Sequence, residues 1–354
     1  MFETLGLTHL TAPQAAILFG LALGVLFGLL AQRTRFCLRR AIAGAPAERR
    51  PAAGIWLTAL AVAILGSQGA VAAGWVSFEA HRLLAGDLPW LAIVTGGLMF
   101  GIGMILTRGC ASRLTVLSGQ GNLRALVVLA VFAIVAHATL KGVLAPLRMT
   151  LGQATLPLGG TLPGPAPLWA AALAVAALAV ALRSGAGWRL LAGAALLGAL
   201  VPLGWVGTGL VLQDDFDPVP LESLSFTAPW ADALFFTIAA SSIPANFGVG
   251  LIGGTLLGAL VAALAFREFR WEGFEGPGQM GRYLAGGALM GAGGVLAGGC
   301  SVGAGLAGVP TLGLAALAAL GSIVAGGLIG RALSDPSSSG SAAPAARPQA
   351  TPAA

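Results

Sequence analysis

The chain has 354 residues, of which 57% are hydrophobic and only 9% are charged, and its formal net charge is +6. A soluble domain carries roughly 25% charged residues, so this composition excludes a water-soluble protein and predicts an exterior that mostly faces lipid. The positive charge does not indicate a nucleic-acid-binding face, because the basic residues lie in short loops between apolar segments, where they set membrane orientation.

Nine apolar segments are long enough to form helices that cross the hydrocarbon core, which takes about 20 residues. In chain order they cover residues 14–31, 52–76, 90–107, 122–146, 167–183, 188–211, 246–266, 281–298 and 311–333. We therefore expect an all-α, polytopic membrane protein with about nine spans, which occupies residues 1–333.

The charges of the loops alternate from one side of these segments to the other. Arginines follow the first, fifth and seventh segments, whereas the acidic residues of the alternate loops are Glu79, Asp87, Asp214, Asp215, Asp217 and Glu222. The positive-inside rule then places the N-terminus outside a bacterial inner membrane and the C-terminus in the cytoplasm, with Lys141 and Arg148 as exceptions. Residues 334–354 are dominated by Ser, Pro and Ala, which predicts a disordered cytoplasmic tail.

An internal repeat ends on a cysteine in both copies. Residues 96–110 read GGLMFGIGMILTRGC and residues 286–300 read GGALMGAGGVLAGGC, at an offset of 190. A second pattern, of glycines spaced four apart, recurs at 20, 24 and 28 and at 250, 254 and 258, and at that offset of 230 Cys37 faces Arg267. We expect pseudo-symmetric halves at about 14–146 and 231–333 joined by linker spans at 147–230, an architecture typical of transporters.

Counting the spans makes the two cysteine segments antiparallel but the two glycine ladders parallel. At least one segment must therefore enter and leave the membrane from the same side as a short re-entrant helix. The apolar run 231–242 is one candidate for such a helix.

Each repeated helix stops at a Gly-Cys pair, which is Gly109-Cys110 in the first copy and Gly299-Cys300 in the second. A broken helix in the bilayer survives only where it is buried in protein or lines a cavity, and its free N–H groups favour an anion. The candidate site thus joins thiols to backbone donors, with further hydroxyls from the serines Ser112, Ser118 and Ser301.

Thiols beside backbone donors suit a soft anion such as thiosulfate, whose terminal sulfur is large and polarizable. A neutral S–H group is a weak donor that could pass such a sulfur along without holding it, as a conduction site requires. A thiolate would repel a dianion, so we expect the cysteines to act protonated. Arg108 and Arg113 could attract anions toward the constriction, although a role as positive-inside anchors explains them equally well.

Two other classes of function stay open on these residues alone. A buried cysteine often only fills space, which would make the chain a structural or anchoring membrane protein. Alternatively, Cys110 and Cys300 would cycle through a disulfide in a membrane thiol-redox protein, although the chain lacks a CxxC motif. The sequence carries no P-loop, no carboxylate deep in a predicted span and no metal- or cofactor-binding pattern, so we expect a transporter and not an enzyme.

The cysteine motifs resemble those of the YeeE/YedE family of bacterial thiosulfate transporters. The resemblance rests on RFCLRR around Cys37, TRGCASRLTVLSGQGNLR around Cys110 and AGGCSVGAG around Cys300, and it covers roughly residues 10–333. It implies an hourglass-shaped protein with re-entrant helices, in which thiosulfate passes between Cys37, Cys110 and Cys300 through S–H···S contacts. It also implies a possible partner, a small cytoplasmic TusA-like sulfur-carrier protein, and leaves other sulfur or selenium compounds open as substrates.

Overall fold

The computed structural model describes residues 10–79, 81–84, 86–214 and 217–334. The predicted disordered tail, apart from its first residue, lies outside the described residues. Within them, nearly all regular structure is helical, and the two strands, β1 (Asp87–Leu88) and β2 (Leu156–Pro157), pair antiparallel over two residues each. The all-α prediction is therefore confirmed.

Long helices coincide with all nine predicted apolar segments. They are α1 (Ala12–Thr34), α3 (Pro46–Ala72), α4 (Trp90–Leu106), α6 (Leu123–Lys141), α8 (Ala166–Leu182), α9 (Trp188–Val206), α11 (Phe247–Ala265), α12 (Pro277–Leu296) and α13 (Leu314–Ser334). In the part of the chain that the structure describes, eight segments are helices long and apolar enough to cross a membrane. The ninth helix, α8, has 17 residues, which is the lower end of the range for a span.

Shorter helices connect the long ones. They are α2 (Leu38–Ala43), α5 (Ala111–Gly119), α7 (Ala145–Gly152), α10 (Ala228–Ala239), the 3₁₀ turns η2 (Arg82–Leu84) and η5 (Val309–Thr311), and the π-helices η3 (Gly207–Val211) and η4 (Ser301–Gly308). Helix α10 holds most of the run 231–242 and has 12 residues. At 1.5 Å per residue it is about 18 Å long, too short to cross a hydrocarbon core of about 30 Å.

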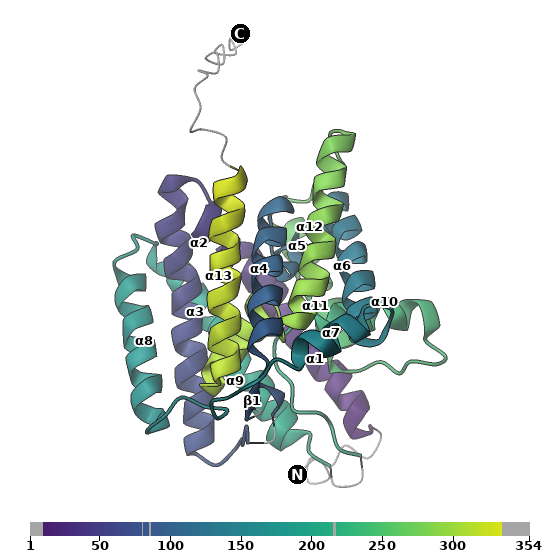
Figure 1. Ribbon diagram of the computed structural model, residues 1–354. Helices are drawn as coiled ribbons and strands as arrows, with labels where there is room; N and C mark the ends of the chain where they lie inside the picture. Colours follow the sequence, from purple (N-terminus) through teal and green to yellow (C-terminus); the bar gives the residue numbers. More distant parts are fainter. Residues whose placement is uncertain (1–9, 80, 85, 215–216, 335–354) are drawn as a thin grey trace.

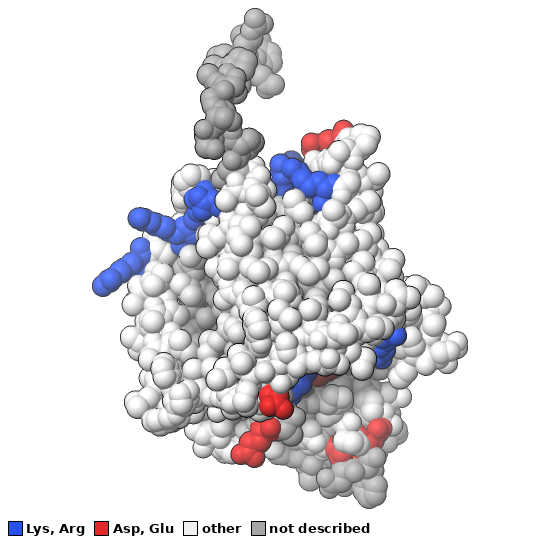
Figure 2. Space-filling model, in the orientation of Figure 1, with Lys and Arg blue, Asp and Glu red and all other residues white. Residues whose placement is uncertain are grey.

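The long helices stand side by side, and the described chain begins at one end of the bundle and finishes at the other (Figure 1). On the face shown in Figure 2, most Lys and Arg lie toward the end of the bundle where α13 finishes, with some Asp or Glu beside them, and further Asp and Glu lie at the opposite end. Most of the surface between the two ends is uncharged. Large apolar side chains such as Leu18, Val175, Leu196 and Leu328 are exposed on the outer helices. An apolar belt of this kind is the surface that a bilayer requires.

Helices α4 and α12, which carry the cysteine repeat, pack against each other in antiparallel fashion. A Cβ added to Gly103 would lie 2.6 Å from the carbonyl oxygen of Gly286, and one added to Gly293 would lie 2.5 Å from that of Gly96. Only glycine permits this approach, so four of the repeated glycines, Gly96, Gly103, Gly286 and Gly293, form the contact between the two copies.

Helices α1 and α11 also contact each other along their glycine ladders, but they run parallel. A Cβ on Gly24 would lie 2.3 Å from the carbonyl oxygen of Leu251, and a Cβ on Gly28 would lie 2.4 Å from that of Thr255. The glycines of α1 and those of α11 thus line the two sides of one interface. The prediction that the ladders are parallel agrees with this packing.

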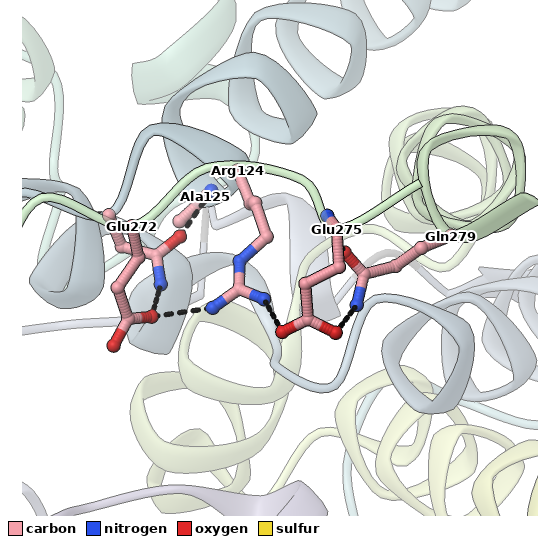
Figure 3. Close-up of polar contacts among 6 residues, drawn as sticks. Arg124, Ala125, Glu272, Glu275 and Gln279 are labelled. Carbon is pink, nitrogen blue, oxygen red and sulfur yellow. Dashed lines mark hydrogen bonds and ion pairs between the residues drawn. The ribbon is translucent and has the colours of Figure 1, made fainter. Parts of the chain in front are cut away.

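A polar clasp ties the start of α6 to the loop before α12 (Figure 3). Arg124 forms ion pairs with Glu272, at 2.5 Å, and with Glu275, at 3.4 Å. Asn122 donates a 2.6 Å hydrogen bond to Glu272, and Gln279 donates one of 3.3 Å to Glu275. These contacts therefore join the start of α6 to the loop before α12 and to the first turns of α12.

Candidate functional site

The three cysteines each precede a short helix inside the bundle. Cys37 begins α2, Cys110 begins α5 and Cys300 begins η4, and each occupies the N-cap position. Their exposed fractions are 3%, 1% and 0%, and all three are free thiols in one continuous core. Residues separated by up to 263 positions in sequence thus share one buried cluster.

Cys37 and Cys110 are neighbours in this cluster, and two predicted serines lie beside Cys110. The thiols of Cys37 and Cys110 lie close enough to interact with each other. The Sγ of Cys110 lies 3.4 Å from the hydroxyl of Ser112 and also lies near the hydroxyl of Ser301, which follows the second copy of the repeat. The Sγ of Cys300 accepts a 3.3 Å bond from the backbone N–H of Gly303. The two copies of the repeat therefore meet at Cys110.

The chain can turn from a long helix into a short one at each repeated cysteine because of the residues before it. Arg108 has a φ of +58° and Gly298 has a φ of +77°, so both lie in the left-handed region that ends a helix. A Cβ on Gly299 would lie 2.7 Å from the backbone nitrogen of Ala304, whereas one on Gly109 would meet only the flexible side chain of Leu114 at 3.1 Å. Glycine is thus more strictly required before Cys300 than before Cys110.

One cavity, which we call the loop cavity, opens near Cys300 among the loops at the acidic end. It has a volume of about 470 Å³. The residues that line it include Ser77, His81, Arg82, Glu222, Ser223, Ser225 and Gly303. Since Gly303 both lines the cavity and bonds the Cys300 thiol, Cys300 lies directly beneath its floor.

Burial controls the charges around the loop cavity. Burial and the nearby charge of Arg82 lower the pKa of His81 to about 4, so this imidazole is neutral near pH 7. Burial raises the pKa of the Glu222 carboxyl, and the neighbouring Asp232 adds to that increase. The Arg82 side chain thus supplies positive charge beside a carboxyl whose ionisation is disfavoured.

A second cavity, the arginine cavity, lies on the other side of the thiols and has a volume of about 320 Å³. It is lined by Gln32, Arg35, Arg40, Glu48, Arg113, Gln120 and Glu268. Arg113 belongs to α5, three residues after Cys110, and its charge acts on both Cys37 and Cys110. Its buried Nη1 has no hydrogen-bond partner among the described residues. This cation is therefore placed to hold an anion beside the thiols.

Two other predicted site residues lie apart from this cluster. Arg108 is exposed and lines a separate cavity of about 210 Å³ together with Asn122, Arg124 and Glu272. The hydroxyl of Ser118 donates a 2.9 Å hydrogen bond to the backbone carbonyl of Leu114 within α5. The structure thus brings together the three cysteines, Ser112, Ser301 and Arg113, but not Arg108 or Ser118.

Sequence reasoning missed the residues that complete the two cavities. The arginines that follow the first apolar segment serve there as orientation signals, yet two of them, Arg35 and Arg40, line the arginine cavity. His81 and Arg82 lie in a loop without a motif. One sequence feature could have indicated the arginine cavity, which is the polar residue Gln32 at the end of an apolar segment. In the structure Gln32 is 5% exposed and donates a 2.5 Å hydrogen bond to Glu268.

Comparison with known proteins gives three matches that cover most of the chain. The model of a family described as "Sulphur transport" matches residues 33–329. A protein of Escherichia coli K12 named "Thiosulfate transporter TsuA" is 30% identical over 322 residues, which is 82% of this chain and 86% of that protein. A protein of the same name from Spirochaeta thermophila is 29% identical over 318 residues, which is 83% of this chain and 92% of that protein.

Proposed function

The chain belongs to the sulphur transport family, and from this premise we propose that it carries thiosulfate into the cell through the buried cysteine cluster. The substrate rests on the names of the two relatives and on the chemistry of the site. A dianion with one soft end needs donors that do not bind it too tightly, and neutral thiols meet that need. The protein is then a transporter and not an enzyme.

The observation that carries this proposal is the position of the thiols between two cavities. Cys300 lies beneath the loop cavity, while Cys37 and Cys110 lie beside Arg113 at the arginine cavity. The terminal sulfur of thiosulfate would pass from Cys300 to Cys110 and then to Cys37 through S–H···S contacts. No bond to sulfur forms or breaks in this relay, and the three thiols keep their protons.

The charges of the two ends support an orientation in the bacterial inner membrane. Basic residues at the end of α13 favour the cytoplasm by the positive-inside rule, and the loop cavity at the opposite end then faces outward. In the proposed orientation the N-terminus is outside and the C-terminus is inside. The arginine cavity would release thiosulfate on the cytoplasmic side, where a small TusA-like sulfur-carrier protein could receive sulfur.

The helix contacts support an inverted repeat that includes α9. Helix α4 packs on α13 as α12 packs on α6, and α1 packs on α11 as α9 packs on α3. The short helices follow the same scheme, because α2 contacts α3 and α13 whereas α10 contacts α11 and α6. We assign α1–α6 to one half and α9–α13 to the other, with α7 and α8 between them, so that α9 leaves the linker predicted at 147–230.

The test is uptake of radiolabelled thiosulfate by cells that lack their other importers of sulfur anions. We expect Cys110→Ala and Cys300→Ala to abolish uptake while protein abundance in the membrane is retained, and Cys37→Ala to reduce it. Thr139→Val provides the control, because Thr139 is a buried residue of α6 that bonds only its own helix. Normal uptake by all three cysteine variants would refute the relay.

The same experiment separates the remaining alternatives. Uptake of another sulfur or selenium compound, with thiosulfate excluded, would change the substrate but keep the site. A disulfide between Cys110 and Cys300 that forms during turnover, shown by mass spectrometry, would instead indicate a thiol-redox protein.

A further inference from the structure

A threonine occupies the start of α10 in the way that cysteines occupy the starts of α2, α5 and η4. Thr227 is the N-cap residue of α10, and only 4% of its surface is exposed. Its Oγ1 is fully buried and has no hydrogen-bond partner among the described residues. Leaving a buried hydroxyl unpaired costs about 1–3 kcal/mol, so a residue kept in this state calls for an explanation.

The offset of 190 that relates the two cysteine segments also relates Thr227 to Cys37. It pairs Phe36 with Phe226, and the next residues are Cys37 and Thr227. The rings of both phenylalanines contact that of Phe27, with ring centroids 6.4 and 5.0 Å away. The offset of 230, which paired Cys37 with Arg267, instead relates the parallel helices α1 and α11, which pack against each other and lie in opposite halves of the proposed repeat.

Thr227 lies close to both the loop cavity and Cys300. It borders a small cavity of about 20 Å³ together with Gly294 and Gly299, and this cavity shares Arg82, Ser225 and Ala228 with the loop cavity. The Cys300 thiol contacts the backbone of Phe226, the residue before Thr227. The free hydroxyl is thus placed where an ion from the loop cavity would first meet the thiols.

A hydroxyl at this point complements the thiols because thiosulfate has two unlike ends. An O–H group donates more strongly than S–H to a hard oxygen, whereas S–H is the better match for the soft terminal sulfur. Four thiols would match only the terminal sulfur of thiosulfate. Three thiols and one hydroxyl can donate to the terminal sulfur and to a sulfonate oxygen at the same time.

Building on the proposed function, we infer that Thr227 is a fourth residue of the constriction, whose hydroxyl donates to a sulfonate oxygen of thiosulfate while Cys300 contacts its terminal sulfur. Thr227 therefore determines specificity for an anion that carries both soft sulfur and hard oxygen.

The test compares Thr227→Val, which keeps the shape and removes the hydroxyl, with Thr227→Ser, which keeps the hydroxyl. Uptake kinetics of thiosulfate would be measured in proteoliposomes with purified protein, and thermal unfolding would report folding. We expect Thr227→Val to raise the KM about tenfold, because it loses one hydrogen bond to a charged group. The KM of Thr227→Ser should stay within about twofold of the wild-type value. Thr139→Val, which removes a hydroxyl from another buried threonine, should keep the wild-type KM.

A wild-type KM for folded Thr227→Val would overturn the inference while leaving the transporter function intact. Equal losses in Thr227→Val and Thr227→Ser would also overturn it, because the hydroxyl would not be the group that matters. If Thr227→Val does not fold, Thr227→Ala takes its place, with the same tenfold expectation and the same refuting result. Failure of the wild-type protein itself to take up thiosulfate would refute the proposed function.

Discussion

The glycine contact between α4 and α12 offers a quantitative test, because it fixes the two helices that end at Cys110 and Cys300. In Gly103→Ala the new methyl group would lie 2.6 Å from the Gly286 carbonyl oxygen, roughly 0.8 Å short of ordinary contact. Overpacking of this size costs about 1–3 kcal/mol. The substitution also gains about 0.5–1 kcal/mol, because alanine favours a helix over glycine.

Gly321→Ala on α13 is the matched control, since nothing lies within 4 Å of its added Cβ. The gain in helix propensity is common to both variants, so the difference between them isolates the overpacking. We expect Gly103→Ala to unfold at a lower temperature than Gly321→Ala, by roughly 2–4 °C for each kcal/mol. Because the helices must separate, thiosulfate uptake should also fall, on the order of tenfold.

Thermal unfolding of purified protein in detergent and uptake by proteoliposomes measure the two effects. Equal melting temperatures and equal uptake for Gly103→Ala and Gly321→Ala would refute the reasoning that this contact positions the thiols. A lower melting temperature with unchanged uptake would show that the contact stabilises the bundle without positioning the cysteines.

Three further predictions concern ionisable groups. Arg113→Ala should raise the KM for thiosulfate about tenfold, with partial recovery in Arg113→Lys, because the cation lies beside two thiols; an unchanged KM would contradict this. Arg124→Ala should lower the free energy of unfolding by only about 0.5–1 kcal/mol. The effect is small because its partners Glu272 and Glu275 are 45% and 78% exposed. A loss above about 3 kcal/mol would contradict this prediction. The pKa of His81 is lowered to about 4, so between pH 6.5 and 4 the unfolded chain binds more protons and stability should fall with acidification. His81→Gln should remove that part of the pH dependence, seen as a smaller change in melting temperature, and an identical pH profile would refute the assignment.

Hydropathy predicted the nine long helices because length and apolarity alone decide whether a segment spans a membrane. The boundaries differ where helices continue beyond the apolar core. The predicted segment 52–76 starts later than α3, whose first turns contain Glu48, Arg49 and Arg50 and line the charged end. Helix α6 ends at Lys141, five residues earlier than predicted, since Gly142 adopts an extended backbone.

The site was less accessible to sequence reasoning because its contacts are not local. The neighbouring serine Ser112 could be placed beside Cys110 from spacing, but the contact of Cys110 with Cys37 depends on how α1, α2 and α5 pack. The periodic glycines of α1 and α11 fit two interpretations, either equivalent helices of an internal repeat or the two sides of one helix contact. The sequence pattern is the same for both. The proposed role of Thr227 rests on its unpaired buried hydroxyl and on the small cavity beside it. One shared phenylalanine at the offset of 190 carries no signal alone.

Uptake by Cys110→Ser in proteoliposomes tests the central claim most directly, because this change replaces sulfur with oxygen and keeps a donor of similar size. We predict that folded Cys110→Ser takes up thiosulfate at least about tenfold more slowly than the wild type, since an oxygen cannot form the soft S–H···S contact. Uptake at the wild-type rate would show that sulfur at this position is not needed and would contradict the account.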